Sequence, residues 1–210
     1  MIRDHRLSRS AKRGFDILLA GAGLLVSAPL WAAFALAIKA EDGGPVFFVQ
    51  ERSGWHGARF NALKFRSMIP DAEVGHGAVQ AREGDPRVTK VGRLLRATAM
   101  DELPQLWNIL RGEMSFVGPR ALRPGEIEAA GPGEVELLED VKGFTERCRV
   151  RPGLTGLAQI YAPRDIPRRL KFRYDRVYVH SHSFWLDIRL IVLSFWITAR
   201  GTWEIRGRKY

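Results

Sequence analysis

Cysteine is almost absent from this chain, and that scarcity excludes several classes of protein. The 210 residues contain one cysteine, Cys148, so no disulfide can form within the chain and a cysteine-rich zinc module is excluded. The GxxxxGK[ST], HExxH and GxSxG patterns are also missing, which removes the signatures of P-loop nucleotidases, zinc metalloproteases and α/β-hydrolases. The five histidines are scattered, and His180 and His182 are expected at the surface rather than as metal ligands.

Acidic residues are outnumbered by basic ones. The chain has 33 Lys and Arg against 23 Asp and Glu, a formal net charge of +10. Such an excess indicates an anionic partner, which can be nucleic acid, an anionic membrane surface or a phosphorylated substrate. Charge alone does not choose among the three.

Charge is entirely missing from one stretch, Ile17–Ile38. A helix of this length reaches about 33 Å, which is enough to cross the hydrocarbon core of a membrane. Three interpretations compete: a signal peptide, a spanning helix and a re-entrant hairpin. The stretch is longer than the apolar region of a signal peptide, and no clear cleavage site of small residues follows it.

Pro29 favours the hairpin, because a proline inside a helix loses a hydrogen bond and clashes with the preceding turn. Ser27 is a candidate to bond a carbonyl that this break frees. Basic residues lie on both sides of the stretch, so the flanks do not distinguish an inside from an outside. The residues alone leave the spanning helix and the hairpin open.

The remaining chain alternates short strand and helix patterns. Pro45–Gln50 and Arg59–Met68 predict a β-hairpin, and Pro70–Pro86 predicts a loop. Gly92–Thr98 predicts a short basic helix. Ile127–Lys142 predicts a surface helix.

Two further helices are predicted with more specific features. Leu103, Leu106, Trp107 and Leu110 form one apolar stripe in a helix that begins near Asp101, since Pro104 is tolerated only in a first turn; Gly112 ends this helix. Phe184–Ala199 is rich in tryptophan and aliphatic residues. It fits either a core helix or a helix lying in the membrane interface.

Asp101 and Glu102 form an acidic pair at the start of a helix, a place where acids are common because they complement the helix dipole. Their basic surroundings suggest a chemical role. Phosphate oxygens suit basic side chains held on turns and strands, and the candidates are Lys64, Arg66, Arg96, Arg120 and Arg151. A carboxylate pair among them suits a magnesium ion that bridges carboxylate and phosphate.

Several longer motifs then follow in one order: Lys12-Arg13-Gly14-Phe15-Asp16, Gly44 to Arg52, Lys64 to Met68, Asp101 to Asn108, Val117 to Arg120, and Arg151 to Gly156. The series closely resembles the bacterial sugar transferases, the small monotopic polyprenyl-phosphate phosphoglycosyl transferases, over roughly residues 10–200. One departure concerns Ser27, which stands one residue earlier than the serine of the family's Ser-Pro pair.

The resemblance implies a reaction. A sugar 1-phosphate would move from a UDP-sugar to polyprenyl (undecaprenyl) phosphate with release of UMP, as the first membrane step of a bacterial glycan pathway such as exopolysaccharide, O-antigen, capsule or glycoprotein. By matching position, Asp101 is the nucleophile that carries the phosphosugar, and Glu102 is the ligand of Mg²⁺. The basic candidates become phosphate- or substrate-binding residues.

The resemblance also implies an architecture. The expected fold is α+β and mainly helical, with a small β-hairpin, interfacial helices and a re-entrant membrane helix broken at Ser27 and Pro29. Residues 1–44 would form the membrane segment and 45–210 the catalytic domain, at the cytoplasmic face of the bacterial inner membrane. The expected partners are the UDP-sugar, polyprenyl phosphate and membrane lipids, with a homo-oligomer left open and no nucleic acid.

Two other functions remain in competition. The first is a basic membrane-anchored protein that binds nucleic acid or anionic lipid, and the second is a glycosyltransferase that releases UDP. A nucleic-acid surface would usually avoid an acidic pair such as Asp101 and Glu102. Release of UMP that depends on magnesium would distinguish the expected enzyme from both.

Overall fold

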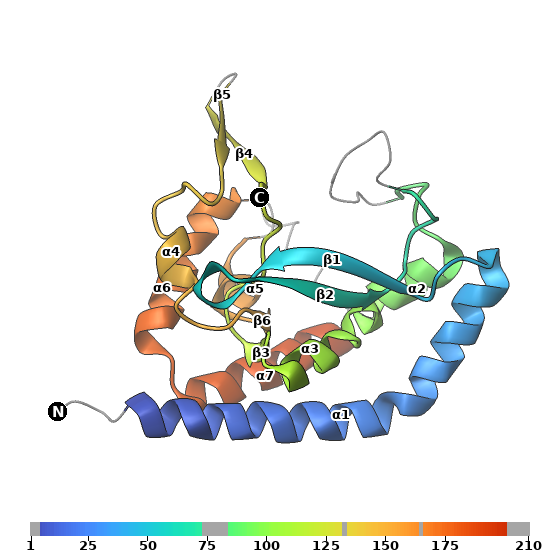
Figure 1. The fold of residues 1–210 in the computed structure, drawn as a ribbon, viewed down its shortest axis with the longest axis horizontal. Coiled ribbons are helices and arrows are strands. Elements are labelled where there is room, and N and C mark those ends of the chain that lie inside the picture. The colour runs from blue at the N-terminus through green and yellow to red at the C-terminus, as the bar shows by residue number, and fades with distance from the viewer. Residues whose placement is uncertain (1–4, 73–83, 132–133, 164–165, 201–210) are drawn as a thin grey trace.

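The computed structural model describes residues 5–72, 84–131, 134–163 and 166–200 as a mixed α/β structure (Figure 1). Within these ranges, three sheets of two strands each lie among the helices, and one long N-terminal helix runs along the side of the body. The predicted mixture of helices and strands is therefore confirmed, and the re-entrant form of the N-terminal helix stays a prediction. Most of the predicted loop Pro70–Pro86 lies outside the described residues.

The long helix α1, His5–Asp42, contains the apolar stretch. Its part Ser10–Asp42, with a hydropathy of 2.0, is long and apolar enough to cross a membrane by length and composition. Pro29 lies inside α1, and Figure 1 shows the helix bending in its second half toward β1. Ser27 is buried there, and its Oγ accepts a hydrogen bond from Trp31 Nε1 at 3.1 Å. The serine thus contacts an indole rather than the freed carbonyl that the sequence suggested.

The N-terminal end of α1 is attached to the body by polar contacts. The Arg13 guanidinium donates to the carbonyl oxygens of Ile109 at 2.6 Å and Leu110 at 2.8 Å. Lys12 forms an ion pair of 2.6 Å with Asp187.

The C-terminal end of α1 is attached to the same body. Asp42 binds the buried guanidinium of Arg66, with one contact of 2.7 Å. Glu41 accepts hydrogen bonds from the backbone N–H groups of Lys90 at 2.6 Å and Val91 at 3.0 Å. The predicted division after residue 44 stays a prediction, but both ends of the membrane segment are bonded to residues beyond it.

The predicted β-hairpin is confirmed as β1, Phe47–Ser53, and β2, Arg59–Phe65, which pair antiparallel. The 3₁₀ turn η1, Trp55–Gly57, connects them. Because side chains alternate along a strand, Phe60, Ala62 and Lys64 share one face of β2. Phe60 and Ala62 are buried in the main core, so this face is turned into the molecule.

After the hairpin the chain forms α2, Lys90–Ala97, the 3₁₀ turn η2, Met100–Glu102, and α3, Gln105–Arg111. The predicted short basic helix and the end of the next helix at Gly112 are both confirmed, the latter with Gly112 at φ 86°. The remaining elements are β3, Ser115–Val117, α4, Phe144–Arg147, β6, Gly153–Thr155, α5, Leu157–Tyr161, α6, Arg168–Ser181, and α7, Phe184–Ala199. Strands β3 and β6 pair parallel.

The predicted surface helix over Ile127–Lys142 is wrong. This region instead contains the antiparallel strands β4, Ile127–Gly131, and β5, Glu134–Leu137, which project from the body in Figure 1. Gly131-Pro132-Gly133 explains the error, because a proline inside a helix costs about 3 kcal/mol and glycine also disfavours helix. Ile127 instead pairs with Leu137 across the two strands.

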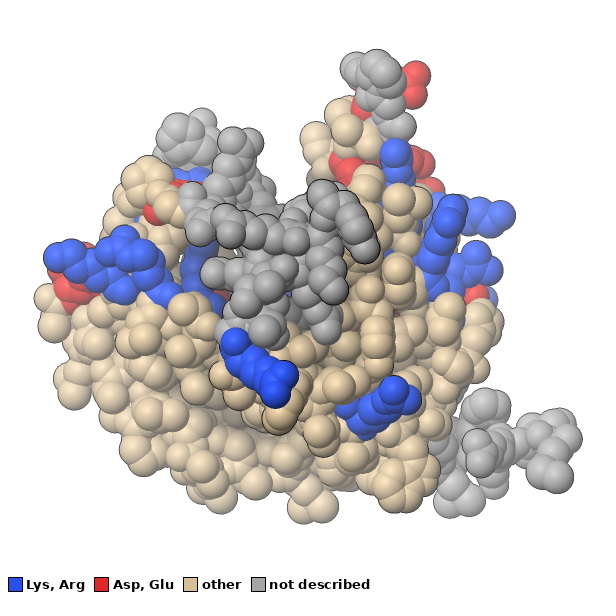
Figure 2. Space-filling model, turned by 180° about the vertical axis from the view of Figure 1, so that it is seen from behind, with Lys and Arg blue, Asp and Glu red and all other residues tan. Residues whose placement is uncertain are grey.

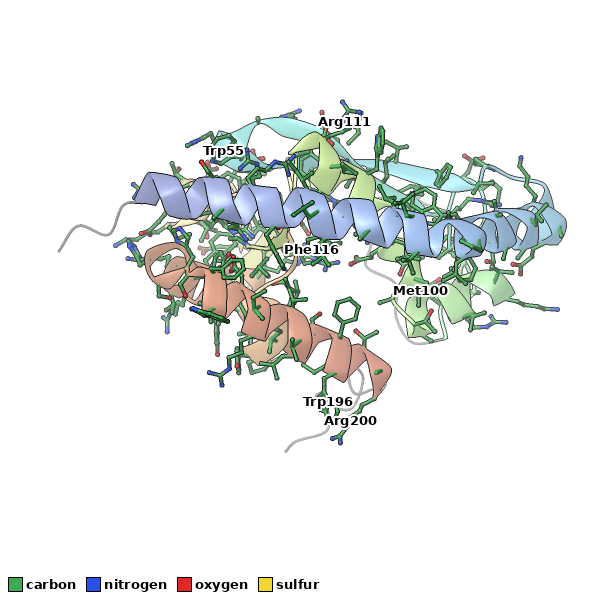
Figure 3. All side chains as sticks on the ribbon, turned by 90° about the horizontal axis from the view of Figure 1, so that it is seen from below. Trp55, Met100, Arg111, Phe116, Trp196 and Arg200 are labelled. Atoms are coloured by element: carbon green, nitrogen blue, oxygen red, sulfur yellow. The ribbon has the colours of Figure 1, made fainter. Side chains whose placement is uncertain are left out.

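Exposed apolar side chains gather on α1 and α7. Figure 3, seen from below, shows α1 and α7 side by side, with Phe116 between them, and the lowest part of Figure 2 shows neither basic nor acidic residues. Leu25 and Val26 of α1 are 80% and 81% exposed, and Trp185 and Phe195 of α7 are 77% and 69% exposed. Leu190 on the other side of α7 is fully buried. Helix α7, confirmed over Phe184–Ala199, thus has both a core face and an exposed apolar face.

Helix α2 packs against the end of β2 through Gly92, where an added Cβ would lie 2.0 Å from the carbonyl oxygen of Ser67. Replacing Gly92 by alanine should therefore force α2 away from β2 and lower the free energy of unfolding by about 1–3 kcal/mol. Thermal unfolding in detergent would measure the loss. Gly14→Ala is the matched control, because open space surrounds Gly14 and alanine favours helix. Equal melting temperatures for the two variants would contradict the packing argument.

Candidate active site

The acidic pair lies in η2, between α2 and α3. Ala99 precedes it in the left-handed conformation, with φ 55°, and so turns the chain sharply out of α2. Pro104 then stands at the N-cap of α3. The helix that the sequence placed near Asp101 thus begins one turn later, and Asp101 and Glu102 are held in a tight turn between two helices.

Two basic side chains approach Glu102 from different elements. Lys64 Nζ, at the end of the inward face of β2, is 2.6 Å from Glu102 Oε1. Arg120, from the loop after β3, has a guanidinium nitrogen 3.6 Å from the same oxygen. Lys64 and Glu102 are 19% and 23% exposed, whereas Arg120 is 56% exposed. The pair of Lys64 and Glu102 is thus half-buried, and Arg120 remains open to a ligand.

Burial and charge act differently on the two acids. Burial would raise the pKa of Glu102, but Lys64, Arg120 and Arg52 outweigh it and lower that pKa to about 2. For Asp101, burial prevails and raises the pKa above its ordinary value, and the charge of Glu102 adds to this rise. The charges of Lys64, Arg96 and Arg120 oppose it. A raised pKa makes the Asp101 carboxylate more basic, and therefore a stronger nucleophile once it is ionised.

Arg96 reaches the site from the last turn of α2. Its Nε donates to the hydroxyl of Ser67 at 2.8 Å, and Ser67 is 8% exposed. The carbonyl of Ser67 packs against Gly92 of α2, so Ser67 fixes both this helix and Arg96, which the helix carries. Lys64, Arg96 and Arg120 are therefore the predicted basic residues that the structure brings to the acidic pair.

The structure places the other two predicted basic residues elsewhere. Arg66 is 6% exposed, binds Asp42 and donates to the carbonyl of Pro45 at 2.6 Å. It therefore holds the end of α1. Arg151 donates to the carbonyl of Gly112 at 2.8 Å and lies over the ring of Trp55, 4.3 Å from its centroid.

Arg52 belongs to the site, although sequence reasoning did not select it. Its guanidinium donates to the carbonyl of Ala121 at 3.1 Å. Burial, together with the charges of Arg120, Arg123 and Arg168, lowers the pKa of Arg52 to about 9. The strand period could have identified it, because Arg52 pairs with Phe60 and so shares the face of Lys64. Arg168, far along the chain on α6, offers no such local signal.

The donor set for a metal is small. Among the described residues, no three His, Cys, Asp or Glu side chains come together to hold an ion. Magnesium, however, usually binds one or two protein carboxylates and completes its shell with water and substrate phosphates. Asp101 and Glu102 fit that mode.

The structure thus joins a helix that is long and apolar enough to cross a membrane to a body that carries a carboxylate pair among cations. The sequence profile described as bacterial sugar transferase matches residues 7–201. The chain belongs to this family.

Individual relatives agree. The exopolysaccharide production protein ExoY of Rhizobium meliloti (strain 1021) is 39% identical over 195 residues, which cover 86% of this chain and 82% of that protein. The undecaprenyl-phosphate glucose phosphotransferase of Komagataeibacter xylinus is 44% identical over 87% of this chain and 35% of its own length. The UDP-glucose:undecaprenyl-phosphate glucose-1-phosphate transferase of Escherichia coli (strain K12) is 40% identical over 90% of this chain and 40% of its own length. This chain thus spans well under half of the last two relatives.

Replacing Lys64 by methionine should raise the pKa values of both acids, because its charge lowers each of them. Titration of ¹³C-labelled side-chain carboxyls by NMR would show the shift. Glu102 has a lowered pKa in the folded protein, so its contribution to stability is present above the ordinary carboxyl pKa and is lost as the pH falls through the lowered value. The Lys64→Met variant should lack this acid-sensitive contribution. Lys90→Met, which removes an exposed charge on α2, is the control, and an unchanged Glu102 pKa in Lys64→Met would contradict the assignment.

Proposed function

We propose that this chain transfers a sugar 1-phosphate from a UDP-sugar to polyprenyl phosphate. The observation that carries the proposal is the half-buried acidic pair Asp101 and Glu102. Lys64, Arg96 and Arg120 lie around this pair, and the body that holds it is joined to the long apolar helix α1. The names of the relatives from K. xylinus and E. coli support the choice of undecaprenyl phosphate as acceptor. The product would begin a bacterial glycan at the membrane.

In the first step, a carboxylate oxygen of Asp101 attacks the phosphorus that bears the sugar. The bond from that phosphorus to the bridging oxygen breaks, and UMP leaves with the electron pair. In the second step, an oxygen of polyprenyl phosphate attacks the same phosphorus and the bond to Asp101 breaks. The products are polyprenyl diphosphate sugar and the free carboxylate, so the enzyme returns unchanged.

The neighbouring charges have separate roles in this scheme. Lys64 keeps Glu102 ionised, and Arg96 and Arg120 bind phosphate oxygens, which an anionic nucleophile could otherwise not approach. A magnesium ion held by Glu102 and by the substrate phosphates would neutralise charge on the leaving group. The raised pKa of Asp101 makes its carboxylate the more basic of the two acids, which suits it to the role of nucleophile.

The contacts at the two ends of α1 support a re-entrant placement. A straight spanning helix would put its ends on opposite sides of the bilayer, yet Arg13 at one end and Asp42 at the other are both bonded to the same body. The bend near Pro29 allows α1 to enter and leave on one side. Trp185 and Phe195 of α7 would then lie in the interface. The basic flanks favour the cytoplasmic face of the inner membrane.

Labelling tests this placement. Ser10→Cys and Ala40→Cys introduce thiols at exposed positions near the two ends of α1, while the native Cys148 is buried. In sealed inverted vesicles, an impermeant maleimide should modify both new cysteines, whereas in right-side-out spheroplasts it should modify neither. Modification of the two sites from opposite sides would show a spanning helix instead.

Asp101→Asn keeps the size of the side chain but removes the nucleophile, so turnover should fall by about 10³-fold or more. Wild-type protein given only a UDP-sugar and magnesium should release UMP, and the peptide containing Asp101 should gain the mass of one phosphosugar. Glu102→Gln should bind magnesium more weakly, so additional magnesium should restore part of its activity. Lys90→Met serves as the control. UDP as product would indicate a glycosyltransferase, and full activity in Asp101→Asn would exclude the covalent scheme.

A further inference from the structure

A buried ion pair outside the acidic pair has no role in the scheme above. Arg147 of α4 and Asp175 of α6 are each only 4% exposed in their side chains, and Arg147 Nε lies 2.8 Å from Asp175 Oδ2. Taking two charges out of water is costly, and the pair can be neutral or even unfavourable for stability compared with apolar residues of similar size. Its further contacts therefore matter.

The same guanidinium has a second partner. Its Nη2 donates to the backbone carbonyl of Arg120 at 2.5 Å. The guanidinium also lies over the ring of Phe172, 4.9 Å from its centroid. Arg147 is thus fixed by an acid and a ring on α6, and it binds the backbone of Arg120, whose side chain extends to Glu102.

The loop around Arg120 is fixed at four successive carbonyl groups. The carbonyl of Pro119 accepts from Gly153 N at 3.0 Å, and that of Leu122 accepts from Ser53 N at 2.9 Å. Between them, the carbonyl of Ala121 accepts from Arg52, and that of Arg120 accepts from Arg147. Two of the four bonds come from the backbone and two from arginine side chains.

The Arg120 side chain itself needs this support. It is 56% exposed and its contact with Glu102 is long, at 3.6 Å. Such an exposed pair alone would hold a flexible side chain weakly. The direction in which Arg120 leaves the loop is therefore set by its backbone, and Arg147 is the buried group that binds that backbone.

We propose that Arg147 is a positioning residue that holds Arg120 toward the phosphates of the nucleotide-sugar. The inference rests on the proposed function, because it assigns Arg120 to the donor. Arg147 does not touch the substrate. It acts through the Arg120 carbonyl, and Asp175 in turn orients Arg147.

A double-mutant cycle tests the inference. Arg147→Lys keeps the positive charge, but a single ammonium cannot reproduce the guanidinium contacts to both Asp175 and the Arg120 carbonyl. Turnover at a saturating concentration of polyprenyl phosphate, followed by UMP release, should show a KM for UDP-sugar raised about tenfold, with a smaller change in kcat. Arg120→Ala should raise KM at least as much. Arg147→Lys added to Arg120→Ala should then change KM less than twofold, because the group that it positions is already gone.

Two further variants separate positioning from general loss of stability. Arg176→Lys alters another ion pair between α6 and α4, in which Arg176 Nε lies 2.6 Å from Glu146, and it should leave KM unchanged. If Arg147→Lys does not fold, Asp175→Asn replaces it, since its amide oxygen can still accept from Arg147 while the charge is lost. Asp175→Asn should also raise KM, but by a smaller factor than Arg147→Lys.

The outcomes distinguish the two proposals. KM effects that multiply in the double variant, or an equal rise in Arg176→Lys, would overturn the positioning role while leaving the transferase function intact. Wild-type protein that binds no UDP-sugar and releases no UMP would instead overturn the proposed function, and the positioning role with it. A non-multiplicative cycle with an unaffected Arg176→Lys supports the inference.

Discussion

The contact between Lys64 and Glu102 is the interaction on which the site depends. Two adjacent half-buried carboxylates repel each other and lose hydration, so one of them needs a close cation to remain charged. Lys64 supplies that cation from the inward face of β2, at 2.6 Å. Glu102 is thereby kept ionised, while the raised pKa of Asp101 leaves it the more basic of the two.

This contact requires that β2, α2 and α1 keep fixed positions relative to one another. Strand β2 must face inward, which Phe60 and Ala62 ensure by their burial. Helix α2 must lie close to the end of β2, which the absence of a side chain at Gly92 permits. Helix α1 is tied into the same arrangement, because Glu41 binds the first backbone N–H groups of α2. The position of α1 and the geometry of the acidic pair are therefore mechanically connected.

Local patterns in the sequence predicted the local structure well. The hairpin, α2, the end of α3 at Gly112 and the bounds of α7 follow from residue spacing, glycine and proline, and the family motifs selected the acidic pair with Lys64, Arg96 and Arg120. Long-range partners could not be predicted in this way. Arg66 looks like a phosphate ligand until Asp42, 24 residues earlier, is placed beside it. The role inferred for Arg147 depends on its contacts with Asp175 and Arg120, each of which is almost thirty residues away in the sequence. The projecting strands β4 and β5 replace the helix expected over Ile127–Lys142, because Gly131-Pro132-Gly133 disfavours a continuous helix.

The exposed apolar side chains of α1 and α7 have a kinetic consequence under the proposed function (Figure 3). With these side chains in the bilayer, the protein would be confined to the surface in which a lipid acceptor diffuses. Encounters in the second half-reaction would then occur in two dimensions, and their frequency would follow the mole fraction of acceptor in the membrane rather than its bulk concentration. Added inert lipid should dilute the acceptor and slow the transfer, whereas the first half-reaction, whose substrate arrives from solution, should not respond. A single chain would thus combine one step whose rate follows the substrate concentration in solution with one step whose rate follows the density of acceptor in the membrane.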